Sequence, residues 1–202
     1  MSKVKAKKQS ISLDMTAMCD MAFLLLTFFI LTAKMKVPEP AQFDVPSSIS
    51  PEIYDEQQNV IRISISNDNR IFLTVPDQTL RREMIDIYAK NFNVPMDEKQ
   101  KMAFELTETF GMQRSDLMTY LNQNTDVRKK FPQSGIPADS TNNELEEWLA
   151  TAIAARSGLN IAIKGDKNSN YEKFGEVVAA LKKRRIYKFS LVTNLESKPS
   201  NI

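Results

Sequence analysis

A single acidic side chain, Asp20, interrupts an otherwise uncharged stretch of seventeen residues from Ala17 to Ala33. At about 100° per residue, a helix places Thr16, Asp20 and Thr27 within an arc of about 40°. A carboxyl group in such surroundings can exchange a proton, because its neutral form tolerates apolar contacts and its ionised form needs water or a polar partner. The spacing therefore predicts a proton-translocating site at Asp20, with the hydroxyl groups of Thr16 and Thr27 beside it.

The stretch around Asp20 has the length of a membrane span. Seventeen residues rise about 26 Å as a helix, close to the ~30 Å hydrocarbon core of a bilayer, and we expect one transmembrane helix over residues 15–36. Asp20 lies one turn inside the apolar run, so a position at the lipid headgroups, where it only marks the helix start, is an alternative. The stretch could also be a cleaved signal peptide. However, Leu31 stands where cleavage needs a small residue, which favours an uncleaved membrane anchor.

The composition excludes several classes of function. The 27 basic and 25 acidic residues give a net charge of +2, which argues against a general nucleic-acid-binding protein. The chain has no histidine and one cysteine, so it lacks the groups for a Ser-His-Asp or Cys-His catalytic set and nearly all ligands of a zinc site. We therefore expect a protein that is not an enzyme and uses no metal or cofactor.

The segments on either side of the predicted span predict its orientation. Residues 1–14 form a basic tail with four lysines before position 9, which favours a cytoplasmic N-terminus. The bulk of the chain is then expected in the periplasm of a Gram-negative bacterium, with the helix in the inner membrane. Residues 37–59 contain four prolines and are expected to form an extended linker, with a reach of up to about 70 Å.

Residues 60–194 carry the pattern of a small two-layer α+β domain, followed by a tail over residues 195–202 that is expected to be disordered. Ile61, Ile63 and Ile65 alternate with polar residues, which predicts the first strand of a hairpin over residues 60–75. Met102, Leu106 and Phe110 recur every four residues, which predicts a buried helical stripe. Helices are expected over residues 77–91, 97–110, 115–122 (capped by Ser115), 142–157 and 171–184, a loop over 124–140, and strands over 159–163 and 186–193.

Three short motifs resemble the ExbD/TolR family of proton-channel subunits. The first is Thr-Ala-Met-Cys-Asp-Met at residues 16–21, followed by an aliphatic run, where the family has Thr-Pro-x-x-Asp-Val; Ala17 replaces the proline and Met21 the valine. The second, Phe43, Asp44, Val45 and Pro46, resembles the family's Val-Asp-Leu-Pro box. The third spans residues 161–166 and 171–174, and resembles the family's strand–Asp–loop–Tyr–helix unit.

The resemblance implies a subunit of an inner-membrane motor driven by the proton motive force, with Asp20 as proton carrier. Implied partners are an ExbB/TolQ-like multi-span ring, a second copy of the chain or a paralogous ExbD, and a TonB-like transducer in the periplasm. Residues 43–46 are expected either to bind a partner or a second copy by strand-like pairing, or to be a plain spacer. A TolR-like protein, or a plain membrane-tethered protein that binds cell wall or a partner, is the alternative. The family's soluble domain usually passes quickly from the hairpin to its first helix, so residues 77–140 are expected as a helical insertion, either a decoration of the core or a docking surface.

Overall fold

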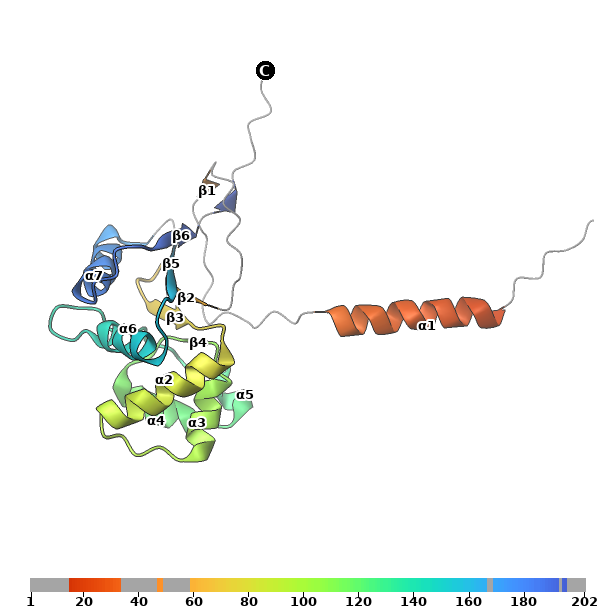
Figure 1. Cartoon of the computed structure of the whole chain (residues 1–202), viewed down its shortest axis with the longest axis horizontal. Coiled ribbons are helices and arrows are strands. Elements are labelled where there is room, and N and C mark those ends of the chain that lie inside the picture. Colours follow the sequence, from red (N-terminus) through yellow and green to blue (C-terminus); the bar gives the residue numbers. More distant parts are fainter. Residues whose placement is uncertain (1–14, 34–46, 49–58, 167–168, 193, 196–202) are drawn as a thin grey trace, which may run out of the picture. The chain divides into compact units, whose positions relative to one another are not determined.

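The computed structural model describes residues 15–33, 47–48, 59–166, 169–192 and 194–195. The chain divides into two compact units, of which the first ends at Pro38 and the second begins at Glu39. The first unit contains helix α1 and the second contains an α+β domain (Figure 1). This order of one N-terminal apolar helix and a mixed α+β domain confirms the predicted fold class.

Helix α1 runs from Met15 to Thr32, and it is long and apolar enough to cross a membrane. None of its residues is buried. The backbone N–H of Ala33 still donates to the carbonyl of Phe29 at 2.9 Å, so the helical pattern reaches the end of this described stretch. The predicted extension to residue 36 lies outside the described residues.

The domain is built on a five-stranded sheet in the order β4-β3-β2-β5-β6. Strands β2 (Val60–Ile65) and β3 (Ile71–Thr74) form the predicted antiparallel hairpin. Strand β5 (Asn160–Gly165) lies parallel to β2, and β6 (Ser190–Val192) lies parallel to β5. The alternating isoleucines of β2 are fully buried, as their spacing predicts, but β6 is shorter than the predicted strand over residues 186–193.

Three helices share one core with the apolar face of the sheet. They are α2 (Gln78–Asn91), α6 (Glu144–Ala155) and α7 (Tyr171–Lys183), all near the predicted positions. The sequence offers Asp77 or Thr79 as the cap of α2, and the structure shows Asp77, whose carboxylate accepts a hydrogen bond from the N–H of Leu80. The spacing of Leu145, Trp148, Leu149, Ala152 and Ile153 predicts an apolar face on α6, and all of these residues are buried except Ile153.

The predicted helix over residues 97–110 is wrong in its second half. Helix α3 ends at Glu105 (Glu98–Glu105), and Thr109–Phe110 form strand β4, paired antiparallel with β3. Met102 and Leu106 are therefore exposed, while Phe110 is buried in the sheet. The spacing of four residues wrongly assigned Met102, of α3, and Phe110, of β4, to one helix.

The remainder of residues 77–140 contains two further short helices. Helix α4 runs from Arg114 to Leu121, and α5 (Thr125–Arg128) lies in the stretch predicted as a loop. The predicted cap by Ser115 is wrong: the carboxylate of Glu144, at the start of α6, accepts from the N–H of Arg114 at 2.7 Å. A residue thirty positions away thus supplies the cap that local sequence was expected to supply.

A second sheet has two strands, one from before the five-stranded sheet in the sequence and one from after it. Strand β1 (Ser47–Ser48) pairs in parallel with β7 (Asn194–Leu195). Leu195 therefore belongs to a strand, although its position predicts the start of a disordered tail. The other residues of that tail lie outside the described part of the chain.

Candidate functional site

Helix α1 carries the three residues predicted to form the proton-translocating site. Thr16 and Asp20 are exposed and Thr27 is half-buried, all on one continuous α-helix. The helix is regular from Met15 to Thr32, so its geometry supports the narrow polar arc that the spacing predicts. Thr27 also lines a shallow apolar groove with Leu24 and Phe28 among its other residues.

The hydroxyl of Thr27 is engaged with the backbone of its own helix. It donates to the carbonyl of Phe23 at 3.0 Å and lies 2.9 Å from that of Leu24. Seven residues separate Thr27 from Asp20, which corresponds to a rise of about 10 Å. On a single helix, therefore, Thr27 does not hydrogen-bond Asp20 directly, and a polar path between them requires water or side chains of another helix.

The predicted partner-binding residues, Phe43, Asp44, Val45 and Pro46, lie outside the described residues. The two residues that follow them, Ser47 and Ser48, form β1. Their register in β1 opposes Asn194 and Leu195 of β7. The chain directly after the predicted box thus has an extended, paired backbone.

The buried charged groups of the α+β domain have structural partners. Arg81 is 6% exposed and donates to the carbonyls of Glu105 at 2.6 Å and Pro76 at 2.9 Å, and also to that of Val75. Glu144 caps α4 as described above. Within the described part of the chain no group of three or more His, Cys, Asp or Glu side chains is placed to hold a metal ion.

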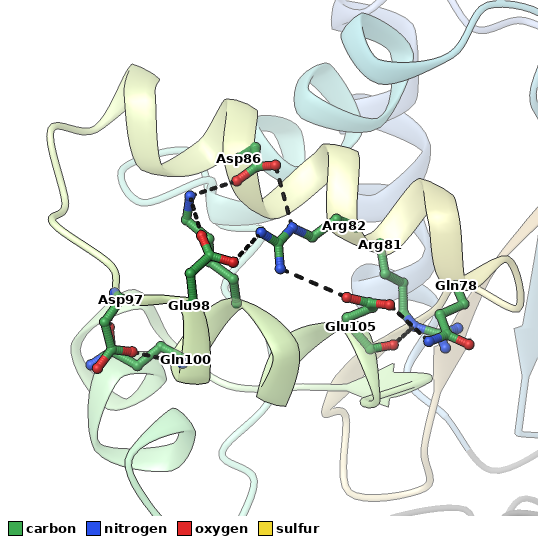
Figure 2. Close-up of polar contacts among 9 residues, drawn as sticks. Gln78, Arg81, Arg82, Asp86, Asp97, Glu98, Gln100 and Glu105 are labelled. Atoms are coloured by element: carbon green, nitrogen blue, oxygen red, sulfur yellow. Dashed lines mark hydrogen bonds and ion pairs between the residues drawn. The ribbon is translucent and has the colours of Figure 1, made fainter.

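An ion-pair network joins α2 to α3 (Figure 2). Arg82 of α2 contacts Asp86 at 3.5 Å, Glu98 at 2.6 Å and Glu105 at 3.8 Å. Lys101 of α3 completes the network through Asp86, 2.8 Å away, and Glu98, 3.7 Å away. Sequence reasoning missed this network, although the i, i+4 spacing of Arg82 and Asp86 and the i, i+3 spacing of Glu98 and Lys101 are a usable signal.

The network favours the ionised form of two of its carboxyl groups, those of Asp86 and Glu98. A hydrogen bond from Lys101 lowers the pKa of Asp86, and a hydrogen bond from Arg82 lowers the pKa of Glu98. Burial raises the pKa of Asp77, but the hydrogen bond and charge of Arg156 and the backbone hydrogen bonds of Leu80 and Thr79 together outweigh it, so that the pKa of Asp77 is also lowered. A proton carrier needs a pKa within reach of ambient pH, so these three carboxyl groups are poor candidates for proton exchange.

Comparison with known proteins agrees with the motifs. The family model described as "Biopolymer transport protein ExbD/TolR" matches residues 6–196, which is nearly the whole chain. Neither a search of curated proteins nor a search of solved structures returned a match. The match covers α1, with Asp20, and almost all of the α+β domain. The chain therefore belongs to the ExbD/TolR family of biopolymer transport proteins.

Proposed function

We propose that this protein is an ExbD-like subunit of an inner-membrane motor that couples the proton motive force to TonB-dependent transport across the outer membrane, with Asp20 as the proton carrier. The observation that carries the proposal is the position of Asp20, the one charged residue of α1, on an apolar helix of membrane-spanning length. A charge there is costly in lipid, by roughly 3 kcal/mol on insertion scales, so its retention calls for a function.

The mechanism follows from the two states of the Asp20 carboxyl group. In the neutral state, Asp20 can pass the apolar surface of a surrounding ring of ExbB/TolQ-like subunits. In the ionised state, it must face water or a polar group. Proton entry from one side and release to the other then bias the motion of α1, paired with the same helix of a second copy or of a paralogous ExbD.

In the polar arc of α1, one threonine lies on each side of Asp20 along the helix. Thr16 lies about 6 Å along the helix from Asp20 and Thr27 about 10 Å on its other side. Since the Thr27 hydroxyl donates to backbone carbonyls, its oxygen remains available to accept a hydrogen bond from water. The two threonines thus hold water on either side of the carboxyl group. The linker after α1 passes the motion to the periplasmic domain and from there to a TonB-like transducer.

Replacement of Asp20 by Asn tests the proposal. Asn keeps the shape and polarity of the neutral acid but cannot release a proton. We expect D20N to abolish uptake that depends on the proton motive force, while expression and assembly stay intact, and D20E to retain part of it. The matched control is C19N, which introduces the same amide one residue earlier and about 100° around the helix.

Three outcomes would count against the proposal. Full uptake by D20N would exclude proton transfer at Asp20. Full uptake after exchange of α1 for an inert apolar helix would show that α1 serves only as a tether, as expected for a membrane-anchored binding protein. Equal loss of uptake in C19N and D20N would mean that any amide in this helix prevents assembly, and the role of Asp20 would then lose its support.

A further inference from the structure

Helix α3 has two contrasting sides. Toward α2, its charged residues Glu98, Lys101 and Glu105 all take part in the ion-pair network (Figure 2). Lys99, Met102 and Leu106 lie beside this network, about 40° to 100° around the helix from Glu98, and they are exposed. Met102 and Leu106 are 58% and 63% exposed, one helical turn apart at the end of α3. An apolar and cationic stripe thus follows the outer side of α3.

Helix α5 extends this stripe. The guanidinium of Arg128 donates to the carbonyl of Ala103 in α3 at 2.8 Å, which holds the two helices together. Val127 on α5 is 50% exposed, and Lys129 and Lys130 follow it at the surface. We define the α3–α5 surface as Lys99, Met102, Leu106, Val127, Lys129 and Lys130.

The three lysines of this surface form no ion pair among the residues that the structure describes. None of them lies within ion-pair distance of a carboxylate in the described part of the chain, in contrast to Arg82 and Lys101. Asp126 is an exposed carboxylate on α5, but it forms no ion pair with these lysines in the described residues. The surface therefore offers positive charge together with exposed aliphatic side chains.

We propose that the α3–α5 surface docks on an anionic lipid bilayer. Lysines around aliphatic residues suit a bilayer surface, because the ammonium groups reach the headgroups while Met, Leu and Val enter the boundary with the acyl chains. Protein interfaces are enriched in methionine too, but they are depleted in lysine and rely on Tyr, Trp and Arg as anchors. The α3–α5 surface contains none of these three.

Because α1 anchors the chain in a membrane, a surface as small as the α3–α5 surface is sufficient for contact of the domain with the bilayer. The proposal shares with the proposed function only the anchoring of α1 in the membrane. Twenty-three residues, 37–59, connect that helix to the domain, so a bilayer remains within about 70 Å of the domain. A contact too weak to recruit a free protein is populated when its partner is held at such short range.

The test uses the full chain with Cys19 replaced by Ser, which removes its one native cysteine. An NBD fluorophore attached at M102C reports from the α3–α5 surface, and the same fluorophore at Y171C reports from α7, where Tyr171 is 83% exposed. Both proteins are reconstituted in phosphatidylcholine vesicles with and without phosphatidylglycerol. Nitroxide-labelled lipid measures the contact of each probe with the bilayer.

We expect lipid quenching of the probe at residue 102, only with phosphatidylglycerol present, and little quenching at residue 171. Charge reversal by K99E, K129E and K130E should lower the bound population relative to the unbound at least on the order of 100-fold, because each lysine near an anionic surface contributes about fivefold and each new glutamate adds repulsion. The control reverses three exposed basic residues elsewhere, K182E, R185E and K188E, and should leave the quenching unchanged. D20N should retain the quenching, which separates this proposal from the function of Asp20.

Equal quenching at residues 102 and 171, or quenching that does not depend on phosphatidylglycerol, would overturn the proposal. So would equal effects of the two charge reversals. Protection of the probe at residue 102 that appears only after a TonB-like protein is added would assign the surface to a protein partner instead.

Discussion

Two adjacent arginines of α2 provide a test of what stabilises the α+β domain. Arg82 is surrounded by three carboxylates, whereas Arg81 forms no ion pair within the described residues and donates to backbone carbonyls instead. Counting ion pairs would rank Arg82 as the more important residue. We expect the buried Arg81 to contribute more to stability than Arg82, because ion pairs near the surface are screened by water and contribute little.

Replacement of Arg81 by Met keeps the aliphatic stem but removes every donor. The carbonyls of Val75, Pro76 and Glu105 then lose their shared partner at the junction of β3, α2 and α3. A buried carbonyl without a hydrogen bond costs about 1 to 3 kcal/mol, and water can reach part of this site. We therefore expect R81M to lower the free energy of unfolding by about 3 kcal/mol, a large share of the roughly 5 to 15 kcal/mol typical of a domain.

Trp148 makes the measurement direct. It is the one tryptophan of the chain, 2% exposed, and stacks on Tyr88 with ring centroids 4.2 Å apart. Its fluorescence therefore follows the loss of the core during urea unfolding of the full chain in detergent. The matched control is R82M, which should shift the midpoint far less than R81M. If R82M destabilises the domain as much as R81M, the ion-pair network dominates and the reasoning from burial is wrong.

Three further predictions concern two glycines and one acid. A Cβ at Gly111 would press on the ring of Phe72, whose Cε1 is 2.7 Å away, so G111A should destabilise the domain by about 2 kcal/mol. A Cβ at Gly175 in α7 would meet open space, so G175A should stabilise the domain by about 0.5 to 1 kcal/mol. Both are measured by urea unfolding, and a G175A that is no more stable than the native chain would contradict the second. Asp86 has a lowered pKa in the folded state, so its contribution to stability is present above its unfolded value near ~4 and is lost as the pH falls through the folded value. Stability should therefore decline in this acid range, and less steeply in D86N; identical acid profiles would refute the assignment.

The sequence predicts those elements whose signals are local. Alternation of isoleucines predicts β2, and Asp77 predicts the start of α2, because period and cap are both encoded within a few residues. The apolar run around Asp20 predicts α1 for the same reason. The family motifs agree with the match over residues 6–196, although the roles of Asp20 and of residues 43–46 stay predictions.

The elements that sequence reasoning missed depend on distant partners. Phe110 leaves the helical pattern because it pairs with Leu73 of β3, and the N–H of Val75 bonds to the carbonyl of Glu108 beside it. Helix α4 begins at Arg114 because Glu144 caps it from another helix. A window of ten or fifteen residues contains neither partner, so local periodicity assigns these residues to the wrong element.

The core also bears on how residues 77–140 relate to the rest of the domain. Trp148 of α6 stacks on Tyr88 of α2 and on Phe104 of α3, and meets Phe110 of β4 edge-on at 4.9 Å. Three of these four aromatic residues come from the segment that the sequence marks as an insertion. An appended decoration would leave the core intact on removal, whereas loss of this segment would expose Trp148 and remove an edge strand. The inner side of residues 77–140 is thus part of the core, which leaves its outer side, with the α3–α5 surface, free to evolve a contact of its own.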